Sequence, residues 1–433
     1  MLPWFGRPVS SAQERERHRG NVIGLRPPAL VLRFAAVSFD MAGLLRSDLP
    51  DGEPRWSGDP PFNFVGGHND PASVPFGGFA EAAAVALARH GPALARYNLG
   101  GSPQGHLPLR EFIAAALDRR ARMPTDPSEV LVTSGSLQAL DIVNAALLAP
   151  GDAVVVEEAT YAGTLSRLAE RGAEVHGVGL DRDGIRIDHL DEILGNLVAR
   201  GRRPKFVYTI PTVQNPTGTV MPVERRRQLL EVARRHGVAI FEDDCYADLV
   251  FDGSRPPTIR SLDTAGGQVV YCGSFSKTLA PALRVGYIVA DWPLMGRLLA
   301  LKTDAGSGAL EQIVIAEYAN AHFDAHVAQL TGVLAGKCEA LAAALREQLG
   351  GVADFVPPRG GIYLWLALPE GVDTAELVAP AAAVGVEFNP GAGWCVDPAY
   401  GARRMRLCFG HLSDEAISEG IAALARVVYA RLG

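Results

Sequence analysis

Residues 269–287 read VVYCGSFSKTLAPALRVGY. The first four, 269–272, form a short apolar run that is typical of a buried strand, and the polar run 273–277 follows it directly. Three more short apolar runs, at 130–133, 206–210 and 238–241, are also followed by distinctive polar groups. Because ligands bind outside the carboxyl ends of the strands in an open parallel sheet, we expect these four polar groups to converge on one rim.

The four polar groups bring different chemistry to that rim. They are Ser134-Gly135-Ser136, Asn215-Pro216-Thr217-Gly218, Glu242-Asp243-Asp244-Cys245-Tyr246 and Gly273-Ser274-Phe275-Ser276-Lys277. Each alone has an ordinary explanation, since Asn-Pro is a common turn and serine a common helix cap. Together they place an amine, carboxylates and hydroxyl groups at one edge, which predicts a ligand site.

The rest of the chain indicates the fold class. Helical patterns at 137–148, 163–171 and 222–236 alternate with the strands and with a further strand at 153–156. This alternation predicts an α/β fold: a large αβα domain with a mostly parallel sheet. After about residue 292, helices at 310–318 and 327–349 precede strands at 362–367, 386–388 and 405–409, which predicts a smaller α+β domain.

The length of 433 residues requires more than one domain. We expect an N-terminal arm and part of the small domain at 1–94, the large domain at 95–320 and the rest of the small domain at 321–433. The arm is expected to include a short helix within residues 1–60.

Charge and composition exclude several classes of function. The net charge of −7 argues against nucleic acid as a partner, because a phosphate backbone needs a basic footprint. The cluster Arg225-Arg226-Arg227 lies on a helical pattern with Glu224 and Glu231, which favours a solvated helix face. His322 and His326, together with Asp324, have the helical spacing of metal ligands, but the sequence suggests no third ligand. A solvated face is again expected there, and no metal.

Cysteine usage and the N-terminus bear on the compartment. Five scattered cysteines without a CxxC pair make a disulfide framework or zinc knuckle unexpected, and they fit a reducing cytoplasm. The first 21 residues are charged and hold no apolar core of a secretion signal, and no apolar stretch approaches the roughly 20 residues that span a bilayer. We expect a cytoplasmic protein with no membrane contact.

The run at 274–287 resembles the cofactor-lysine motif of fold-type I pyridoxal 5′-phosphate (PLP) enzymes. Asn215-Pro216-Thr217-Gly218 and Asp243-x-x-Tyr246 resemble the other two signatures of that superfamily, in the usual order. Within it, the chain is most similar to the 2-aminoadipate/aromatic aminotransferases and the related half of MocR regulators. The resemblance covers about residue 60 to the end.

The resemblance implies roles for the residues that act on the cofactor ring. Lys277 would carry PLP as a Schiff base and then act as the base that moves a proton at Cα. Asp243 would keep the pyridine nitrogen protonated, with Asp244 as the competing neighbour. Tyr246 and Asn215 would hydrogen-bond the ring oxygen. Tyr161 would stack on the ring, with a core tyrosine as the less favoured alternative.

The phosphate of PLP needs fixed donors and positive charge. The backbone N–H groups of Ser136 and Leu137 at a helix start would supply fixed donors, and Gly135 would let the chain approach the phosphate closely. Ser274, Ser276 and Arg284 would add side-chain donors, although the serines could be simple caps. Since Arg284 lies between Leu283 and Val285, we expect it to be partly buried beside an anion.

The substrate side of the site is implied in the same way. Arg406 alternates with Met405 and Leu407 and resembles the arginine that binds the substrate α-carboxylate, with Arg403 and Arg404 as competitors. Gly66 and Gly67 match a glycine pair that lies near this carboxylate in relatives, and His68, Asn389 and Trp394 are candidates for the side-chain wall. Tyr97 is a departure, because it lies further upstream than the tyrosine that reaches the partner subunit's phosphate in relatives.

Three functions remain open from the sequence. The first is an aminotransferase that moves the α-amino group of a 2-aminoadipate, aromatic or branched-chain type amino acid to a 2-oxo acid such as 2-oxoglutarate. The second is a PLP-dependent lyase, decarboxylase or oxidase. The third is a regulatory ligand sensor, disfavoured by the acidic charge and by the lack of a helix-turn-helix pattern. A homodimer is expected by resemblance.

Overall fold

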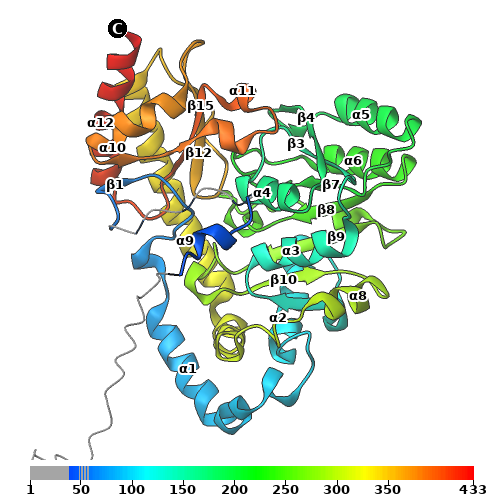
Figure 1. Ribbon diagram of the computed structural model, residues 1–433. Helices are drawn as coiled ribbons and strands as arrows, with labels where there is room; N and C mark the ends of the chain where they lie inside the picture. Colours follow the sequence, from blue (N-terminus) through cyan, green and yellow to red (C-terminus); the bar gives the residue numbers. More distant parts are fainter. Residues whose placement is uncertain (1–38, 48, 50–51, 53–54, 56–57) are drawn as a thin grey trace, which may run out of the picture. The chain divides into compact units, whose positions relative to one another are not determined.

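The apolar runs form a seven-stranded sheet in the computed structural model, which describes residues 39–47, 49, 52, 55 and 58–433 (Figure 1). Along the sheet the strands are β2 (Val130–Thr133), β10 (Gly286–Val289), β9 (Val269–Ser274), β8 (Ala239–Asp243), β7 (Phe206–Thr209), β3 (Ala153–Glu157) and β4 (Glu174–Val178). All pairings are parallel except those of β10. The predicted α/β class with a mostly parallel sheet is confirmed.

The antiparallel strand β10 was not predicted, and it matters for the rim. Its first residue, Gly286, pairs with Thr133 at the end of β2 and with Ser274 at the end of β9. Because an antiparallel strand begins where its parallel neighbours end, the residues just before β10 also reach the rim. Arg284 is therefore delivered to the same edge as the polar groups of β2 and β9.

Helices cover both faces of this sheet. On one face, α5 (Ile187–Ala199) and α6 (Val223–Arg235) pack on Val155, Val207 and Ile240. On the other face, α3 (Ser136–Leu147) and α4 (Ala162–Glu170) pack on the alternate residues Val154, Val156 and Phe241. Burial of successive residues on opposite faces explains why these strands read as continuous apolar runs.

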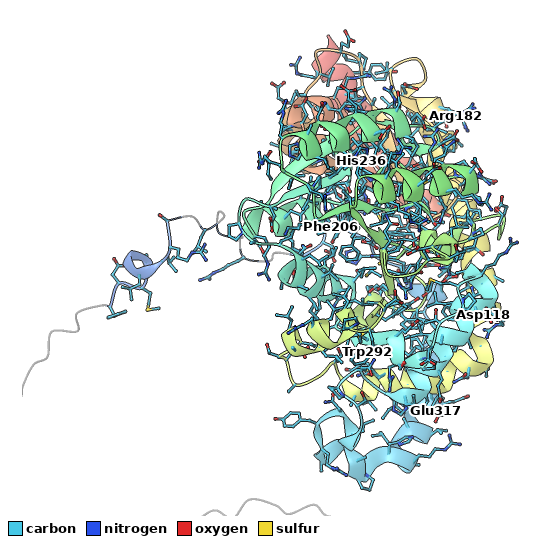
Figure 2. The ribbon with its side chains drawn as sticks, turned by 90° about the vertical axis from the view of Figure 1, so that its right-hand side faces the viewer. Asp118, Arg182, Phe206, His236, Trp292 and Glu317 are labelled. Atoms are coloured by element: carbon cyan, nitrogen blue, oxygen red, sulfur yellow. The ribbon has the colours of Figure 1, made fainter. Side chains whose placement is uncertain are left out.

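Helix α6 corrects the expectation for Arg225-Arg226-Arg227. The helix ends at the C-cap His236, which Figure 2 labels, and Arg227 is exposed as predicted. Arg226, however, is fully buried, and its guanidinium donates to the carbonyl oxygens of Met221, Pro257 and Pro211. These backbone acceptors and the Glu242 carboxylate, 3.8 Å away, compensate its burial, so the cluster is not a uniformly solvated face.

A second, four-stranded sheet follows in the C-terminal part of the chain. Its order is β11 (Asp354–Phe355), β12 (Tyr363–Ala367), β15 (Arg404–Cys408) and β14 (Asn389–Pro390), all antiparallel. Strand β1 (Phe62–Asn63) pairs with β13 (Val386–Glu387), so residues just after position 60 lie beside the C-terminal part. Shorter elements include β5 (Leu180–Asp181), β6 (Gly184–Ile185), α7 (Ile259–Leu262), α8 (Leu294–Leu301), α10 (Val378–Ala383) and α11 (Pro398–Gly401).

One long helix replaces the two predicted at 310–318 and 327–349. Helix α9 (Ala309–Leu349) runs through the gap without a break, because Ala319, Phe323 and Val327 continue its buried stripe. Its first half packs against α1 (Phe76–His90) and α2 (Leu107–Ala121), and its second half against α12 (Asp414–Leu432), as Figure 1 shows. Glu317 of α9, labelled in Figure 2, pairs with Arg89 of α1 at 2.8 Å.

The same helix corrects the expectation for His322 and His326. His322 is exposed, whereas His326 is buried, so only one of them belongs to a solvated face. The proposed boundary at 320/321 falls within α9, and the predicted division of residues 58–433 into two domains stays a prediction.

The chain divides by its contacts into Met1–Ser57 and Gly58–Gly433. In the first unit, the described residues include one short 3₁₀ helix at Ala42–Leu44, while most of the predicted arm lies outside the described residues. Throughout the ranges that the structure describes, no helix combines the length and the apolar character needed to cross a membrane.

Candidate active site

The predicted rim carries a cavity of about 340 Å³ at the carboxyl ends of β2, β7, β8 and β9. Of the predicted cofactor and substrate residues, all except Gly135 and the wall candidate His68 line it, and Gly135 directly precedes the lining residue Ser136. Asn389 and Arg406 of the second sheet close the cavity, together with Trp394 from the 3₁₀ helix that follows β14. The residues that the sequence singled out at separate strand ends therefore meet around one space.

Lys277 lies in the turn that follows β9, with its amine inside the cavity. Its Nζ donates a 2.6 Å hydrogen bond to the carbonyl oxygen of Gly67. Burial lowers the pKa of this amine to about 8, so a substantial fraction is neutral near physiological pH. A neutral amine is the form that attacks a carbonyl carbon.

Asp243 ends β8 and turns its carboxylate into the cavity. Tyr208 donates to its Oδ2 at 2.7 Å, and burial raises the pKa of the Asp243 carboxyl. Asp244 points elsewhere, since its Oδ2 accepts from Arg255 at 3.0 Å and from Tyr271 at 3.2 Å. Of the two neighbours, only Asp243 lines the cavity, as the sequence favoured.

A cradle of donors lies at the β2 and β10 side of the cavity. Gly135 has φ of 80° and directly precedes α3, so the first N–H groups of the helix open toward the cavity at Ser136 and Leu137. A Cβ at Gly135 would collide with the Arg284 guanidinium. Ser276 is buried and donates through its backbone N–H to Ser274 Oγ at 3.1 Å.

Arg284 differs from expectation in its burial. The side chain is exposed rather than partly buried, and it donates to the carbonyl oxygen of Ser134 at 3.3 Å. Its backbone is left-handed, with φ of 51°, at the end of the 3₁₀ turn Pro281–Leu283. The apolar neighbours Leu283 and Val285 therefore do not carry the arginine inward with them, although its guanidinium still lines the cavity.

Arg406 is 2% exposed and is held from several directions. Its Nε donates to Asn215 Oδ1 at 3.0 Å, and its Nη1 donates to Gly66 O at 2.8 Å and to Asn389 Oδ1 at 3.2 Å. The rings of Tyr363 and Trp394 lie 4.5 and 4.7 Å from its Cζ. This leaves Nη2 as the part of the guanidinium best placed to meet a ligand.

The competitors of Arg406 lie elsewhere. Arg403 donates to the Leu368 carbonyl, and Arg404 stacks on the Tyr400 ring at 3.9 Å. Neither lines the cavity.

Two tyrosines complete the walls. Tyr161 is partly buried, its ring centroid lies 6.1 Å from that of Trp394, and burial raises its pKa. Tyr246 is buried with its ring 5.8 Å from Lys277 Nζ, and burial raises the pKa of its phenol as well. Both therefore stay protonated at neutral pH and can donate.

Backbone hydrogen bonds join the Tyr161 wall to the Trp394 wall. Thr160 N–H donates to Trp394 O at 2.8 Å, Val396 N–H donates to Glu158 O at 2.9 Å, and Ala159 forms a bridge with Cys395. The parts of the wall that come from residues 158–161 and 394–396 are thus fixed to each other.

Several functional neighbours were missed from the sequence. Tyr208 is one, and the signal was available, because a tyrosine inside an otherwise apolar buried strand needs a polar partner. Glu157 is another: its buried carboxylate accepts from Thr209 and Gln214, and burial raises its pKa to about 7.

Two residues that the sequence singled out lie outside the cavity. Tyr97 is 83% exposed and does not line the cavity of this chain, and His68 is exposed outside it.

The donor set fits PLP. The cradle around Gly135 and Arg284 offers N–H and O–H groups to a phosphate, Asp243 offers an acceptor to a pyridinium nitrogen, and Lys277 offers an amine to an aldehyde. Arg406 remains for a carboxylate. The residues present thus match the phosphate, ring nitrogen and aldehyde of the cofactor with complementary groups.

Comparison with known proteins agrees with this geometry. Residues 79–424 match the family model described as aminotransferase class I and II. Aromatic-amino-acid aminotransferase 1 of Thermococcus litoralis is 33% identical over 374 residues, which cover 84% of this chain and 87% of the relative.

Two solved structures are similar over most of the chain. The multiple substrate aminotransferase of Thermococcus profundus superimposes with a TM-score of 0.84 at 30% identity, covering 91% of this chain and 99% of the other. LysN, the α-aminoadipate aminotransferase of Thermus thermophilus complexed with N-(5′-phosphopyridoxyl)-L-leucine, gives 0.79 at 32% identity, covering 86% and 92%. The chain belongs to the aminotransferase class I and II family and is a PLP-dependent aminotransferase of fold type I.

Proposed function

We propose that the chain moves the α-amino group of an amino acid with an aromatic, branched or 2-aminoadipate-type side chain to a 2-oxo acid such as 2-oxoglutarate. The observation that carries the proposal is the shared cavity: the amine of Lys277, the carboxylate of Asp243 and the guanidinium of Arg406 all line it. Bound PLP supplies an electron-withdrawing ring that stabilises negative charge at Cα of the amino acid.

The residues of the cavity divide the work of binding. Lys277 holds the cofactor covalently, and Asp243 holds a proton on the ring nitrogen through a carboxylate fixed by Tyr208. Ser136, Ser274 and Arg284 bind the phosphate together with the first N–H groups of α3. Gly135 gives the phosphate close access, and Leu137 and Ser276 contribute to the same end of the cavity.

The substrate carboxylate is oriented by Arg406 through Nη2, and Asn215 is fixed beside it because its Oδ1 accepts from Arg406 Nε. Tyr246 and Asn215 would donate to the ring oxygen, and Tyr161 would cover one face of the ring. The amino group of the substrate would take the place of the Lys277 amine on the cofactor, which frees that amine. With the carboxylate held, the freed amine of Lys277 would remove the proton from Cα as the general base. Gly67 keeps the backbone close to that amine.

The substrate class is supported by the walls and by the relatives. Val65, Ile210 and Trp394 give the cavity apolar surface that suits an aromatic or branched side chain. The names of similar proteins cover aromatic amino acids, α-aminoadipate and multiple substrates. These two observations favour a site with broad side-chain tolerance.

The protein is further proposed to act as a homodimer in the cytoplasm. Phe76 and Tyr97 are 76% and 83% exposed, and Leu94 and Leu107 are also exposed in the same part of the sequence. Exposed apolar side chains of this size are typical of a subunit interface. Five free, buried cysteines are consistent with a reducing compartment.

The test is a panel of amino acids with the PLP-loaded enzyme and 2-oxoglutarate. Conversion of the bound cofactor to its pyridoxamine form, with release of the 2-oxo acid, is the expected result. Ammonia, CO₂ or peroxide without amino transfer would indicate the lyase, decarboxylase or oxidase alternative instead. Specific retardation of DNA would indicate the regulatory alternative, and sedimentation at defined concentrations measures the oligomeric state.

A further inference from the structure

Three successive backbone carbonyl groups, beginning with that of the predicted cofactor lysine, accept hydrogen bonds from side chains rather than from the backbone of a helix or strand. Lys277, Thr278 and Leu279 lie in the turn between β9 and the 3₁₀ helix Pro281–Leu283. Buried carbonyl oxygens need donors, and here two side chains from distant segments supply them. The path of the backbone at Lys277 therefore depends on residues that lie far away in the sequence.

Asn69 is the first of these side chains. It is 8% exposed, and its Nδ2 donates to Lys277 O at 3.4 Å and to Leu279 O at 3.2 Å. Its own segment, residues 66–70, also touches the other end of the lysine, since Gly67 O accepts from Lys277 Nζ at 2.6 Å. The 66–70 segment thus holds both the backbone and the amine of Lys277.

The 66–70 segment is itself anchored on both sides. Gly66 O accepts from Arg406 Nη1 at 2.8 Å, and Asp70 lies 3.6 Å from the ammonium group of Lys337. Lys337 in turn donates to Leu412 O at 2.7 Å. A segment fixed at both ends provides a rigid reference against which Asn69 can set the position of the lysine.

His326 of α9 holds the same turn from another direction. Its Nε2 lies 2.8 Å from Thr278 O, and because that partner is a carbonyl, Nε2 must carry the hydrogen. Burial lowers the pKa of His326, which favours the neutral ring, and the donor to Thr278 O is present in the charged ring as well. The turn is thus held between the 66–70 segment and α9.

We propose that Asn69 is a positioning residue for Lys277, which fixes the lysine backbone against the 66–70 segment so that the amine can reach only the space beside Gly67. This inference rests on the proposed function, because it takes Lys277 as the residue that binds the cofactor. His326 assists from α9 by fixing Thr278. Neither side chain lines the cavity, so both act through Lys277.

The test uses cofactor-free enzyme mixed with PLP, with covalent capture by Lys277 followed by absorbance across a pH series. In the wild type, the capture rate is expected to rise with pH through a midpoint near 8, as the amine loses its proton. In Asn69→Ala the rate should fall about tenfold, the effect of one lost positioning hydrogen bond. The midpoint should also move upward, because a looser segment admits water to the amine.

His68→Ala is the matched control, since His68 belongs to the same segment but is exposed and donates nothing to the turn. It should leave the rate and the midpoint unchanged. His326→Leu removes the second donor and His326→Gln retains one, so capture should slow in the first and recover in the second. This pair keeps the test decisive if Asn69→Ala does not fold.

Different results would contradict the proposed function and the positioning role of Asn69. If the wild type never captures PLP, the proposed function falls. If the wild type captures PLP and the Asn69 and His326 variants match it in rate and midpoint, only the positioning role is overturned. Loss of thermal stability without any change in capture would also overturn it, because that result assigns Asn69 a purely structural contact.

Discussion

Tyr208 in β7 donates its phenolic hydrogen to Asp243 Oδ2 in β8 across a distance of 2.7 Å. The two strands pair in parallel register, so the bond is built into the sheet below the cavity. Both groups are buried, and the hydrogen bond stabilises the charged form of the Asp243 carboxyl against the effect of burial. The negative charge of Asp243, which is proposed to hold the proton on the ring nitrogen, thus depends on Tyr208, which does not itself line the cavity.

Tyr208→Phe should therefore raise the pKa of Asp243 and weaken its hold on the ring nitrogen. A hydrogen bond to a charged group contributes about 1.5–3 kcal/mol, so kcat should fall about tenfold or more. The acidic limb of the kcat profile should move upward by about one pH unit. Steady-state rates across a pH series measure both effects.

Tyr271→Phe provides the control, because Tyr271 donates to the neighbouring Asp244 at 3.2 Å. It removes the same kind of bond from a carboxylate outside the cavity. An equal shift of the acidic limb in both variants would contradict a specific role for Tyr208.

Gly135→Ala should weaken PLP binding by about 10- to 100-fold. The added Cβ would displace the Arg284 guanidinium, and losing one charged phosphate contact costs about 1.5–3 kcal/mol. Equilibrium binding of PLP to cofactor-free enzyme measures the change.

Gly151→Ala separates this effect from backbone strain. Gly151 has φ of 85°, close to the 80° of Gly135, but a Cβ there meets nothing within 4 Å. Both variants should lose stability because each alanine takes a positive φ, and Gly135→Ala should lose more, since its ψ of 172° lies in a region that is essentially restricted to glycine. Similar PLP affinities in the two variants would show that contact with Arg284 is not what matters.

Glu157 should give the cofactor-free protein an unusual pH dependence. Burial raises the pKa of its carboxyl from 4.5 to about 7, so the folded protein binds this proton more tightly than the unfolded chain does. The stability that the proton contributes is fully present below pH 4.5 and is lost as the pH rises through 7. The loss amounts to about 3 kcal/mol for this group.

Glu157→Gln removes the titration, so its free energy of unfolding should change less between pH 4.5 and 7 than that of the wild type. Urea unfolding of both proteins at matched pH values gives the two curves. Parallel curves would mean that Glu157 does not titrate in this range.

Arg406→Lys should raise the KM for the amino acid about 100-fold while leaving PLP affinity close to that of the wild type. Lysine keeps the charge but loses the planar group that Asn215 and Asn389 orient. Arg403→Lys is the control, because Arg403 bonds a backbone carbonyl away from the cavity. If both variants raised KM equally, the α-carboxylate role would have to be given up.

Much of the site could be predicted because its residues come directly after the ends of strands. The apolar runs before Ser136, Asn215, Asp243 and Lys277 are short and strongly β-forming, and parallel strands must place their carboxyl ends on one edge. The position of these residues around one cavity follows from that topology alone. The roles within the cavity came from resemblance and stay proposals.

What escaped prediction depends on contacts between distant segments. Arg226 looks like its neighbours in the sequence, and its burial is explained by acceptors that include the distant carbonyls of Pro211 and Pro257. His326 reads as part of a polar helix face, yet its partner Thr278 lies 48 residues away. The sequence does not indicate the partners of Asn69, because its acceptors belong to the turn after β9.

The backbone bonds between residues 158–160 and 394–396 limit how the cavity can open. A shear that slides the Trp394 wall past Tyr161 would break several of them at once, whereas a rotation about this junction would keep them. Any widening of the cavity that keeps these bonds is therefore a rotation about residues 158–160 and 394–396.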